Sequence, residues 1–227
     1  MGKLVNSINF KDPIINNNFT DVYSPSDDSY LILDFLKKVI TKRKFDDLPL
    51  QEVKRILDMG TGTGIIAIFL EMVKSLINSF HCKIYASDVL PNAIYCARLN
   101  EKLNNLNNRI RFIESNLFIS FPKDLSHSLD IIIFNPPYLP SIENSLSLDN
   151  DNTWNGGDTG IEILMEFFKQ AKKFLSNQGV IYFICSSNTP VKVLLNNLSS
   201  KGFYVEEKDK IHFFFEDIIL NKARLKH

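Results

Sequence analysis

The sequence is poor in the features that mark secreted, metal-binding or membrane proteins. Its three cysteines, Cys82, Cys96 and Cys185, are widely spaced and odd in number, which argues against a disulfide framework and a zinc site. No apolar run approaches the roughly 20 residues that span a bilayer, and the N-terminus lacks the long apolar core of a signal peptide. We therefore expect a cytoplasmic protein without a metal site, whose cysteines are small buried residues.

An excess of charge is also missing. Lys and Arg number 26, and so do Asp and Glu, so nothing indicates a general affinity for nucleic acid or for an anionic membrane. With 227 residues, 44% of them hydrophobic, the chain is long enough for one well-buried domain and short for two. We expect a single domain over residues 1–227, in which residues 1–50 form an N-terminal cover and a helix.

Strand-like apolar runs alternate with helical patterns along the chain. Five strands and a closing strand pair are expected at residues 54–58, 83–88, 110–114, 130–134, 179–185, 203–208 and 211–220. Helices are expected at residues 25–40, 65–78, 91–104, 160–175 and 190–200. Residues 1–22 are expected to be a loop or an irregular cover, residues 42–50 a polar connection and residues 145–155 a loop. This alternation predicts an α/β fold with a seven-stranded, mostly parallel sheet and helices on both faces, with the strand at 110–114 on an edge.

The chain is organised around the run Asp130 to Tyr138, a short apolar strand that stops at Asn-Pro-Pro-Tyr. Neither proline has an N–H for a sheet ladder, and Pro136 forces Asn135 into an extended conformation. The carboxyl ends of strands bind ligands in open α/β sheets. The Asn135 oxygen and the Pro136 carbonyl could each accept one hydrogen of an –NH2 group. The tetrapeptide alone fits a proline-capped strand end equally well, with Tyr138 as a packed turn residue.

A glycine loop, Asp58-x-Gly60-x-Gly62-x-Gly64, stands between a predicted strand and a predicted helix. Such a loop lets the backbone approach a ligand closely and presents helix N-terminal amides to an anionic group. Asp88 ends the next strand, where a carboxylate can accept both hydroxyls of a ribose. A dinucleotide fingerprint would read Gly-x-Gly-x-x-Gly. Here the glycines alternate strictly and an acid precedes them, which favours S-adenosylmethionine as the ligand. Asp58 could form an ion pair with the ammonium group of that molecule. The alternative is a tight glycine turn without a ligand.

These motifs, with Asn135-Pro136-Pro137-Tyr138, resemble those of class I methyltransferases of the HemK type, which methylate glutamine in peptide release factors. The resemblance extends from about residue 22 to the end. Val22-Tyr23-x-Pro25-x-x-Asp28 and Trp154-x-Gly156-Gly157-x-x-Gly160 are similar to signatures of the short archaeal and eukaryotic branch. That branch implies a Rossmann-like fold, the Gly-Gly-Gln glutamine of the class 1 release factor as substrate, and a small zinc-binding activator.

The resemblance also implies roles for individual residues. By this resemblance the residues that bind S-adenosylmethionine are Tyr23, Pro25, Asp28, Ser29, Asp58, Gly60, Thr61, Gly62, Thr63, Gly64, Asp88, Val89, Asn116, Leu117 and Asn135. It assigns the substrate to Asn135, Pro136, Pro137 and Tyr138, with Asn135, Pro136 and Tyr138 as the catalytic group. Asn116 stands where the family usually has an Asp that accepts from the adenine amine. The activator would pair with the edge strand Arg109 to Glu114, giving a heterodimer.

Three alternatives to a protein glutamine substrate stay open. Asn-Pro-Pro-Tyr also occurs in adenine-N6 DNA methyltransferases, although base flipping usually calls for a basic cleft. A lysine in a protein such as a histone would first have to lose a proton, and the motifs contain no base for it. A non-catalytic binding module would be expected to lose the loop glycines or the tetrapeptide. The four histidines, His81, His127, His212 and His227, lie outside all motifs.

Overall fold

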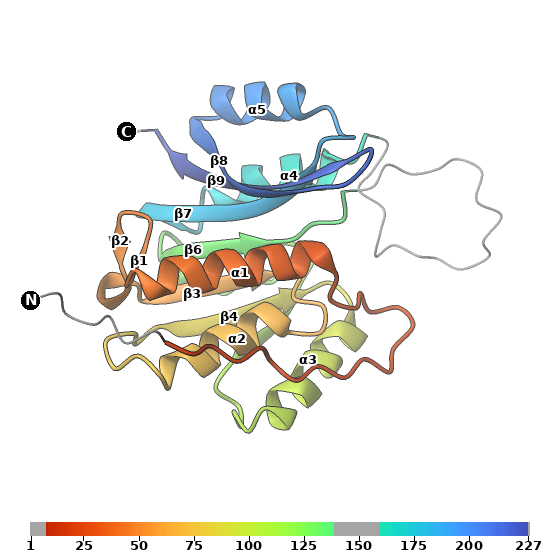
Figure 1. The fold of residues 1–227 in the computed structure, drawn as a ribbon. Coiled ribbons are helices and arrows are strands. Elements are labelled where there is room, and N and C mark those ends of the chain that lie inside the picture. The colour runs from red at the N-terminus through yellow and green to blue at the C-terminus, as the bar shows by residue number, and fades with distance from the viewer. Residues whose placement is uncertain (1–7, 139–158, 227) are drawn as a thin grey trace, which may run out of the picture.

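The computed structural model describes residues 8–138 and 159–226, which form a seven-stranded sheet with helices against both faces (Figure 1). The strands lie in the order β5-β4-β3-β6-β7-β9-β8. Their bounds are β3 Arg55–Met59, β4 Lys83–Asp88, β5 Arg111–Glu114, β6 Leu129–Phe134, β7 Leu175–Ser186, β8 Phe203–His212 and β9 Asp217–Leu225. The pairs from β5 to β7 are parallel, and only β9 pairs antiparallel with β7 and β8. The predicted seven-stranded, mostly parallel α/β sheet is confirmed.

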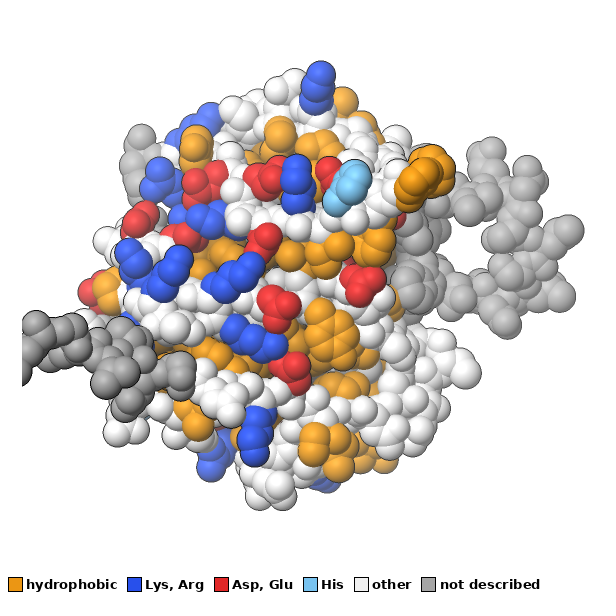
Figure 2. All heavy atoms as spheres, in the orientation of Figure 1, with side chains coloured by type: hydrophobic (Ala, Val, Ile, Leu, Met, Phe, Trp, Pro, Cys, Tyr) orange, Lys and Arg blue, Asp and Glu red, His pale blue; other side chains and the backbone are white. Residues whose placement is uncertain are grey.

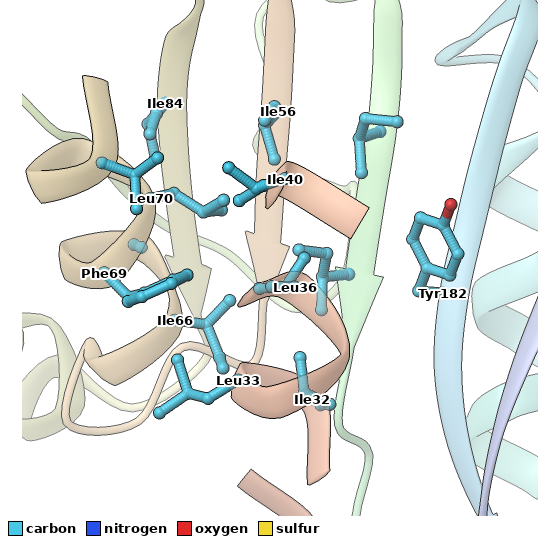
Figure 3. Close-up of a cluster of buried hydrophobic side chains, with 14 of the residues drawn as sticks. Ile32, Leu33, Leu36, Ile40, Ile56, Ile66, Phe69, Leu70, Ile84 and Tyr182 are labelled. Atoms are coloured by element: carbon cyan, nitrogen blue, oxygen red, sulfur yellow. The ribbon is translucent and has the colours of Figure 1, made fainter. Parts of the chain in front are cut away.

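Two large buried clusters lie against the sheet, one on each face. On one face lie α1 (Asp27–Thr41), α2 (Ile65–Lys74) and α3 (Pro91–Leu103); α4 (Glu162–Ala171) and α5 (Val191–Ser200) lie on the other. Figure 3 shows Leu36 of α1 and Phe69 of α2 on the same side of the sheet as Ile56 of β3 and Ile84 of β4, in one cluster. Because neighbouring strand residues point to opposite faces, both clusters draw on the same strands.

The central strand β6 is buried on both faces. Ile131 and Ile133 belong to the cluster under α1 and α2, whereas Ile132 and Phe134 belong to the cluster under α4. Burial on both faces explains why this strand is an uninterrupted apolar run. It also fixes the strand end that leads into Asn135.

Several predicted boundaries differ from the structure. The strand predicted at 110–114 begins at Arg111, because the N–H groups of Arg109 and Ile110 donate to Glu101 Oε1 instead of to a ladder. The helix predicted at 160–175 begins at Glu162, since Gly160 has a φ of +79°. α2 ends at Lys74 in i→i−3 turns.

The closing strand pair is longer than predicted and turns later. β8 runs on to His212, past a register shift between Glu207 and Asp209, and the chain reverses over residues 213–216. The bulged residue, Lys208, forms an ion pair with Asp46 at 2.6 Å. The prediction of a strand break after Lys208 was therefore wrong because a bulge continues the strand. Residues 42–50, predicted as a connection, contain a two-residue hairpin of β1 (Lys44–Phe45) and β2 (Leu48–Pro49) followed by a 3-10 helix, η1 (Leu50–Glu52).

The described part of the N-terminal segment is irregular, as predicted, and lies along α3. Asn100 Oδ1 accepts from Asn16 N, and Asn104 Oδ1 accepts from Ile14 N, both at 2.9 Å. All three cysteines are buried and free. Among the described residues no helix has the length and apolar character needed to cross a membrane, and no group of three or more His, Cys, Asp or Glu could hold a metal ion. The loop predicted at 145–155 lies outside the described residues.

Candidate active site

A cavity of about 570 Å³ opens at the carboxyl edge of the sheet. Parallel strands end at one edge, so β3, β4 and β6 bring Asp58, Asp88 and Asn135 to the same space. The turn between β8 and β9 contributes Glu216, because β9 runs antiparallel to β7 and starts where β7 ends. Residues from distant parts of the sequence thus share one cavity.

The glycine loop is fixed to the neighbouring strand β4. Thr61 N donates to Ser87 O at 2.9 Å, and Gly62 N donates to Asp88 Oδ2 at 2.9 Å. A Cβ on Gly60 would lie 3.3 Å from the Phe134 ring and 3.8 Å from the Asn135 carbonyl oxygen. The absence of a side chain at Gly60 therefore lets the loop lie directly beside the Asn-Pro-Pro-Tyr segment.

Asp58 is buried beneath the loop. Its Oδ2 accepts from Thr61 Oγ1 at 2.6 Å and from Ala67 N, in the first turn of α2, at 3.2 Å. Burial raises the pKa of Asp58 to about 7; the two hydrogen bonds oppose this, and the nearby charge of Asp88 adds to it. Near neutral pH the carboxyl group is poised between its neutral and charged forms.

Asp88 ends β4 with both oxygens engaged by backbone. Oδ1 accepts from Leu90 N at 3.0 Å, while Oδ2 accepts from Gly62 N. Burial raises its pKa, and these N–H donors oppose the rise. Each carboxylate oxygen has further lone pairs, so the backbone contacts orient Asp88 and leave it acceptor capacity for ligand hydroxyls.

Asn135 follows β6 directly and lines the cavity. Its Oδ1 is buried and has no hydrogen-bond partner among the described residues. Buried acceptors without a donor are rare and costly. In this rotamer the oxygen is closed off from solvent, so a ligand N–H group would meet it only after the side-chain amide turns about χ2.

Asp28, at the start of α1, joins three segments of the site. The Tyr23 hydroxyl donates to its two oxygens at 2.8 and 2.9 Å, and the Tyr138 hydroxyl donates to Oδ2 at 3.1 Å. The N–H and hydroxyl of Ser29 complete the set. Burial raises the pKa of Tyr138, and the negative charge of Asp28 raises it further, so the phenol stays a hydrogen-bond donor. Asp28 thus fixes the position of Tyr138.

Gly160, the last residue of the predicted Trp-x-Gly-Gly-x-x-Gly signature, packs against the same tyrosine. A Cβ there would lie 2.5 Å from the Tyr138 carbonyl oxygen. Trp154, Gly156 and Gly157 of that signature lie outside the described residues. The glycine allows the chain entering α4 to contact the end of the Asn-Pro-Pro-Tyr segment.

The structure brings all the predicted site residues but one to the cavity. Those that line it are Tyr23, Pro25, Asp28, Ser29, Asp58, Gly60, Thr61, Gly62, Thr63, Asp88, Val89, Asn116, Leu117, Asn135, Pro136, Pro137 and Tyr138. Gly64 does not line it. It precedes α2 with a φ of +86°, and a Cβ on it would lie 2.9 Å from Ala97 Cβ, so it serves the packing of α2 on α3.

Three acids of the lining were not predicted from the sequence. Glu162 and Glu166 lie one turn apart on α4, and Glu216 lies in the β8–β9 turn. None belongs to a motif, and only the packing of α4 and β9 against the sheet brings them to the cavity. The spacing of Glu162 and Glu166 gave no signal by itself, since acids at i and i+4 occur on many exposed helix faces.

The chain is similar to known methyltransferases over most of its length. The model of the methyltransferase small domain matches residues 41–214. The chain belongs to this methyltransferase family. It is 34% identical to a Methanocaldococcus jannaschii protein assigned as an N5-glutamine methyltransferase, over 90% of this chain and 93% of that protein. It is 28% identical to the catalytic subunit mtq2 of the eRF1 methyltransferase of Schizosaccharomyces pombe, over 83% of each chain. The predicted membership of the HemK-type methyltransferases is confirmed.

Solved structures agree on the fold. The Mtq2–Trm112 complex of E. cuniculi, which is responsible for methylation of the eRF1 translation termination factor, superposes with a TM-score of 0.60 at 22% identity, covering 92% of this chain and 100% of that one. The N-terminal domain of human METTL16 superposes with a TM-score of 0.63 at 16% identity, covering 95% and 76%. The class I methyltransferase fold predicted from the sequence is confirmed.

S-adenosylmethionine is the methyl donor of this methyltransferase family, and the cavity fits it. The glycine loop provides a backbone surface beside two buried carboxyl groups, Asp58 and Asp88. Every charged side chain in the described lining is acidic: Asp28, Asp58, Asp88, Glu162, Glu166 and Glu216. A ligand that carries a sulfonium and an ammonium group matches that charge.

Proposed function

We propose that this methyltransferase transfers a methyl group to the side-chain amide of a protein glutamine, that of the Gly-Gly-Gln motif in the class 1 translation release factor. The observation that carries the proposal is Asn135 directly after β6, an amide in the cavity lining whose oxygen has no hydrogen-bond partner among the described residues. The names of the M. jannaschii and S. pombe relatives support it. We further propose that residues 1–227 act as one methyltransferase domain.

In this proposal Asn135 and Pro136 hold the substrate nitrogen. The Asn135 oxygen and the Pro136 carbonyl each accept one hydrogen of the –NH2 group, which fixes the nitrogen and raises its electron density. A half-turn of the Asn135 side chain about χ2 exchanges its oxygen and nitrogen, so Oδ1 can be presented to the cavity without movement of the backbone. Tyr138, held by Asp28, forms a wall of the substrate pocket.

S-adenosylmethionine, when bound, supplies a methyl group on a cationic sulfonium. Asp88 would hold the ribose hydroxyls and Asp58 the ammonium group, while loop residues 60–63 would lie along the ligand. Asn116 and Leu117 would hold the adenine end, with Tyr23, Pro25, Asp28, Ser29 and Val89 completing the enclosure. An amide nitrogen is a weak nucleophile, so the chain contributes alignment more than base strength.

The charge of the cavity favours a protein substrate over a nucleic acid. The described lining has no Lys, Arg or His. On the face in Figure 2 basic and acidic side chains are intermingled and form no basic tract. Phosphate groups would meet only negative charge at the cavity, which disfavours the DNA adenine alternative.

We also propose a small zinc-binding partner that pairs with β5, which makes the active protein a heterodimer. β5 is an edge strand, so one row of its backbone groups has no neighbouring strand in the sheet. The two-protein Mtq2–Trm112 complex of E. cuniculi supports a second subunit. The pairing segment is Arg111–Glu114, shorter than the Arg109 to Glu114 of the sequence prediction. A release factor as substrate places this complex in the cytoplasm.

The test is a methyl-transfer assay with the protein alone and with the co-expressed partner. Both forms are incubated with labelled S-adenosylmethionine and a class 1 release factor, and the Gly-Gly-Gln peptide is analysed by fragmentation mass spectrometry. We expect one methyl group on the glutamine nitrogen.

A release factor with the glutamine replaced by asparagine is the matched control. It retains an amide but shortens the side chain, and we expect no label in it. A methyl group on a lysine, or no transfer with either form of the enzyme, would contradict the proposal.

A further inference from the structure

Three consecutive phenylalanines form the turn between β8 and β9. Phe214 and Phe215 are 88% and 83% exposed, and Phe213 is 37% exposed. The turn is closed by Phe213 N donating to Glu216 O at 2.7 Å, and the rings of Phe214 and Phe215 meet edge to face at 4.6 Å. Two-residue hairpin turns normally carry Gly, Asn or Asp. Residues that contradict local preference without a packing role point to function.

This turn, residues 213–216, adjoins the candidate active site. Glu216 lines the cavity and accepts a hydrogen bond from Ser186 Oγ, at the carboxyl end of β7. Asp217 N donates to Ser187 Oγ at 2.8 Å, and Ser187 N donates to Asp217 O at 2.9 Å. These bonds fix the backbone of the turn beside the cavity, and Figure 2 shows hydrophobic side chains projecting at this end of the hairpin.

We propose that Phe214 and Phe215 dock the protein substrate, by contact with apolar side chains that surround the target amide in the folded substrate. The inference rests on the proposed protein substrate and extends it. The cavity recognises the target side chain of the substrate, and the turn recognises the substrate surface around that side chain. Its basis is the continuity between turn and cavity through Glu216.

The charges nearby argue for a protein over a lipid surface. Glu216 belongs to the turn and lines the cavity, whose described charges are all acidic, whereas Asp217 is paired with His212 and lies 3.8 Å from Lys210. An anionic membrane would be repelled there, whereas aromatic rings beside carboxylates suit an apolar protein patch with a basic rim. Exposed aromatic residues also lose little conformational entropy on docking.

The test compares kinetics on two substrates. The wild type and the double variant Phe214→Ser, Phe215→Ser, each with the co-expressed partner, are assayed on a folded release factor and on a short peptide that carries its Gly-Gly-Gln sequence. For the folded protein we expect KM to rise about 10- to 100-fold, the scale on which interface aromatics act, with kcat changed by less than about twofold. The ratio of kcat/KM between protein and peptide should fall by the same factor.

Leu76→Ser is the matched control. Leu76 is 53% exposed and follows α2, at the end of that helix remote from the glycine loop, and we expect wild-type constants for it. An unchanged KM for the folded protein, or equal losses on both substrates, would overturn the docking role. So would a dimer seen by light scattering, or binding to phosphatidylserine vesicles, that the double variant loses. Absence of transfer by the wild type to either substrate would instead overturn the proposed function, and the docking role with it.

Discussion

Asn135 shows how much of the proposed chemistry rests on one side chain. The proline pair after it holds the backbone, and its buried oxygen has no donor among the described residues. In the proposed mechanism this oxygen contributes alignment and polarisation, while other residues bind the methyl donor. Its loss should therefore affect rate far more than cofactor affinity.

We predict that Asn135→Ala reduces kcat by about 10²–10³-fold, the effect of removing one preorganised polar contact. Single-turnover kinetics would measure the rate, and calorimetric titration would show an S-adenosylmethionine affinity close to wild type. Asn177→Ala, at an exposed position near the amino end of β7, is the control. Wild-type turnover in the Asn135 variant would exclude the mechanism.

Asp58 gives a prediction about pH. Its pKa is raised by burial to about 7, whereas the ordinary value in an unfolded chain is 3.8. The folded protein therefore favours the protonated form, and the contribution of this group to stability falls as pH rises from about 4 to 7. An ammonium group beside Asp58 would favour the charged form, so cofactor binding should release a proton.

We expect affinity for S-adenosylmethionine to rise as pH increases from 6 to 8, and Asp58→Asn to flatten this dependence. Calorimetry in buffers of different ionisation enthalpy would count the released proton. The charge-free amide keeps the size of the side chain, which makes it the matched variant. The same pH slope in Asp58→Asn would assign the proton to another group.

At the scale of elements, the packing of α2 on α3 depends on Gly64. Its φ of +86° disfavours any side chain, and a Cβ would also lie 2.9 Å from Ala97 Cβ. Gly202 has nearly the same φ, +87°, but its nearest contact for a Cβ is the end of Lys172, at 3.7 Å. A comparison of the two positions distinguishes the cost of backbone strain, which a side chain would meet at both, from the cost of steric overlap, which it would meet only at Gly64.

We predict that Gly64→Ala lowers the free energy of unfolding by about 2–4 kcal/mol, through strain plus overpacking. Gly202→Ala should cost only the strain, about 1 kcal/mol. Urea denaturation of the two variants would measure the difference. Equal losses would mean that α2 and α3 can separate slightly to admit the methyl group.

At the scale of the whole molecule, an ionic cluster around one buried lysine joins the β1–β2 hairpin to the final strands. Lys222 of β9 is buried and lies 3.3 Å from Asp46 and 3.2 Å from Glu206. Asp46 also accepts from the hydroxyl of Tyr182 at 2.8 Å and pairs with Lys208. Despite burial, the hydrogen bonds from Lys208 and Tyr182 lower the pKa of Asp46. The cluster connects chain segments that are far apart in the sequence.

Asp46→Ala should lower the free energy of unfolding by about 2–4 kcal/mol, since it leaves Lys222 with one partner in a buried site. Because the pKa of Asp46 is lowered, its contribution is present above about pH 4 and is lost below it. Asp34→Ala, which removes an exposed partner of Lys37, should change stability by less than about 1 kcal/mol. Thermal unfolding at pH 7 and pH 3 would compare them; a loss for Asp46→Ala that persists unchanged at pH 3 would contradict an ionic role.

The sequence by itself determined the parallel strands, the glycine loop and the Asn-Pro-Pro-Tyr strand end. These features are local: double proline and closely spaced glycines restrict their own backbone, and an apolar run such as Ile131–Phe134 has no stable place except a doubly covered strand. The predicted residues ending β3, β4 and β6 meet because these strands are parallel neighbours in the sheet and end at one edge.

Only the tertiary structure decided which other side chains join them. Glu162, Glu166 and Glu216 reach the cavity because α4 packs on one face and β9 reverses beside β7. Asp28 binds Tyr138 from 110 positions away, and Gly64 serves helix packing although it belongs to the loop motif. Such contacts depend on strand order and on the relative positions of distant elements, which no local pattern of residues encodes.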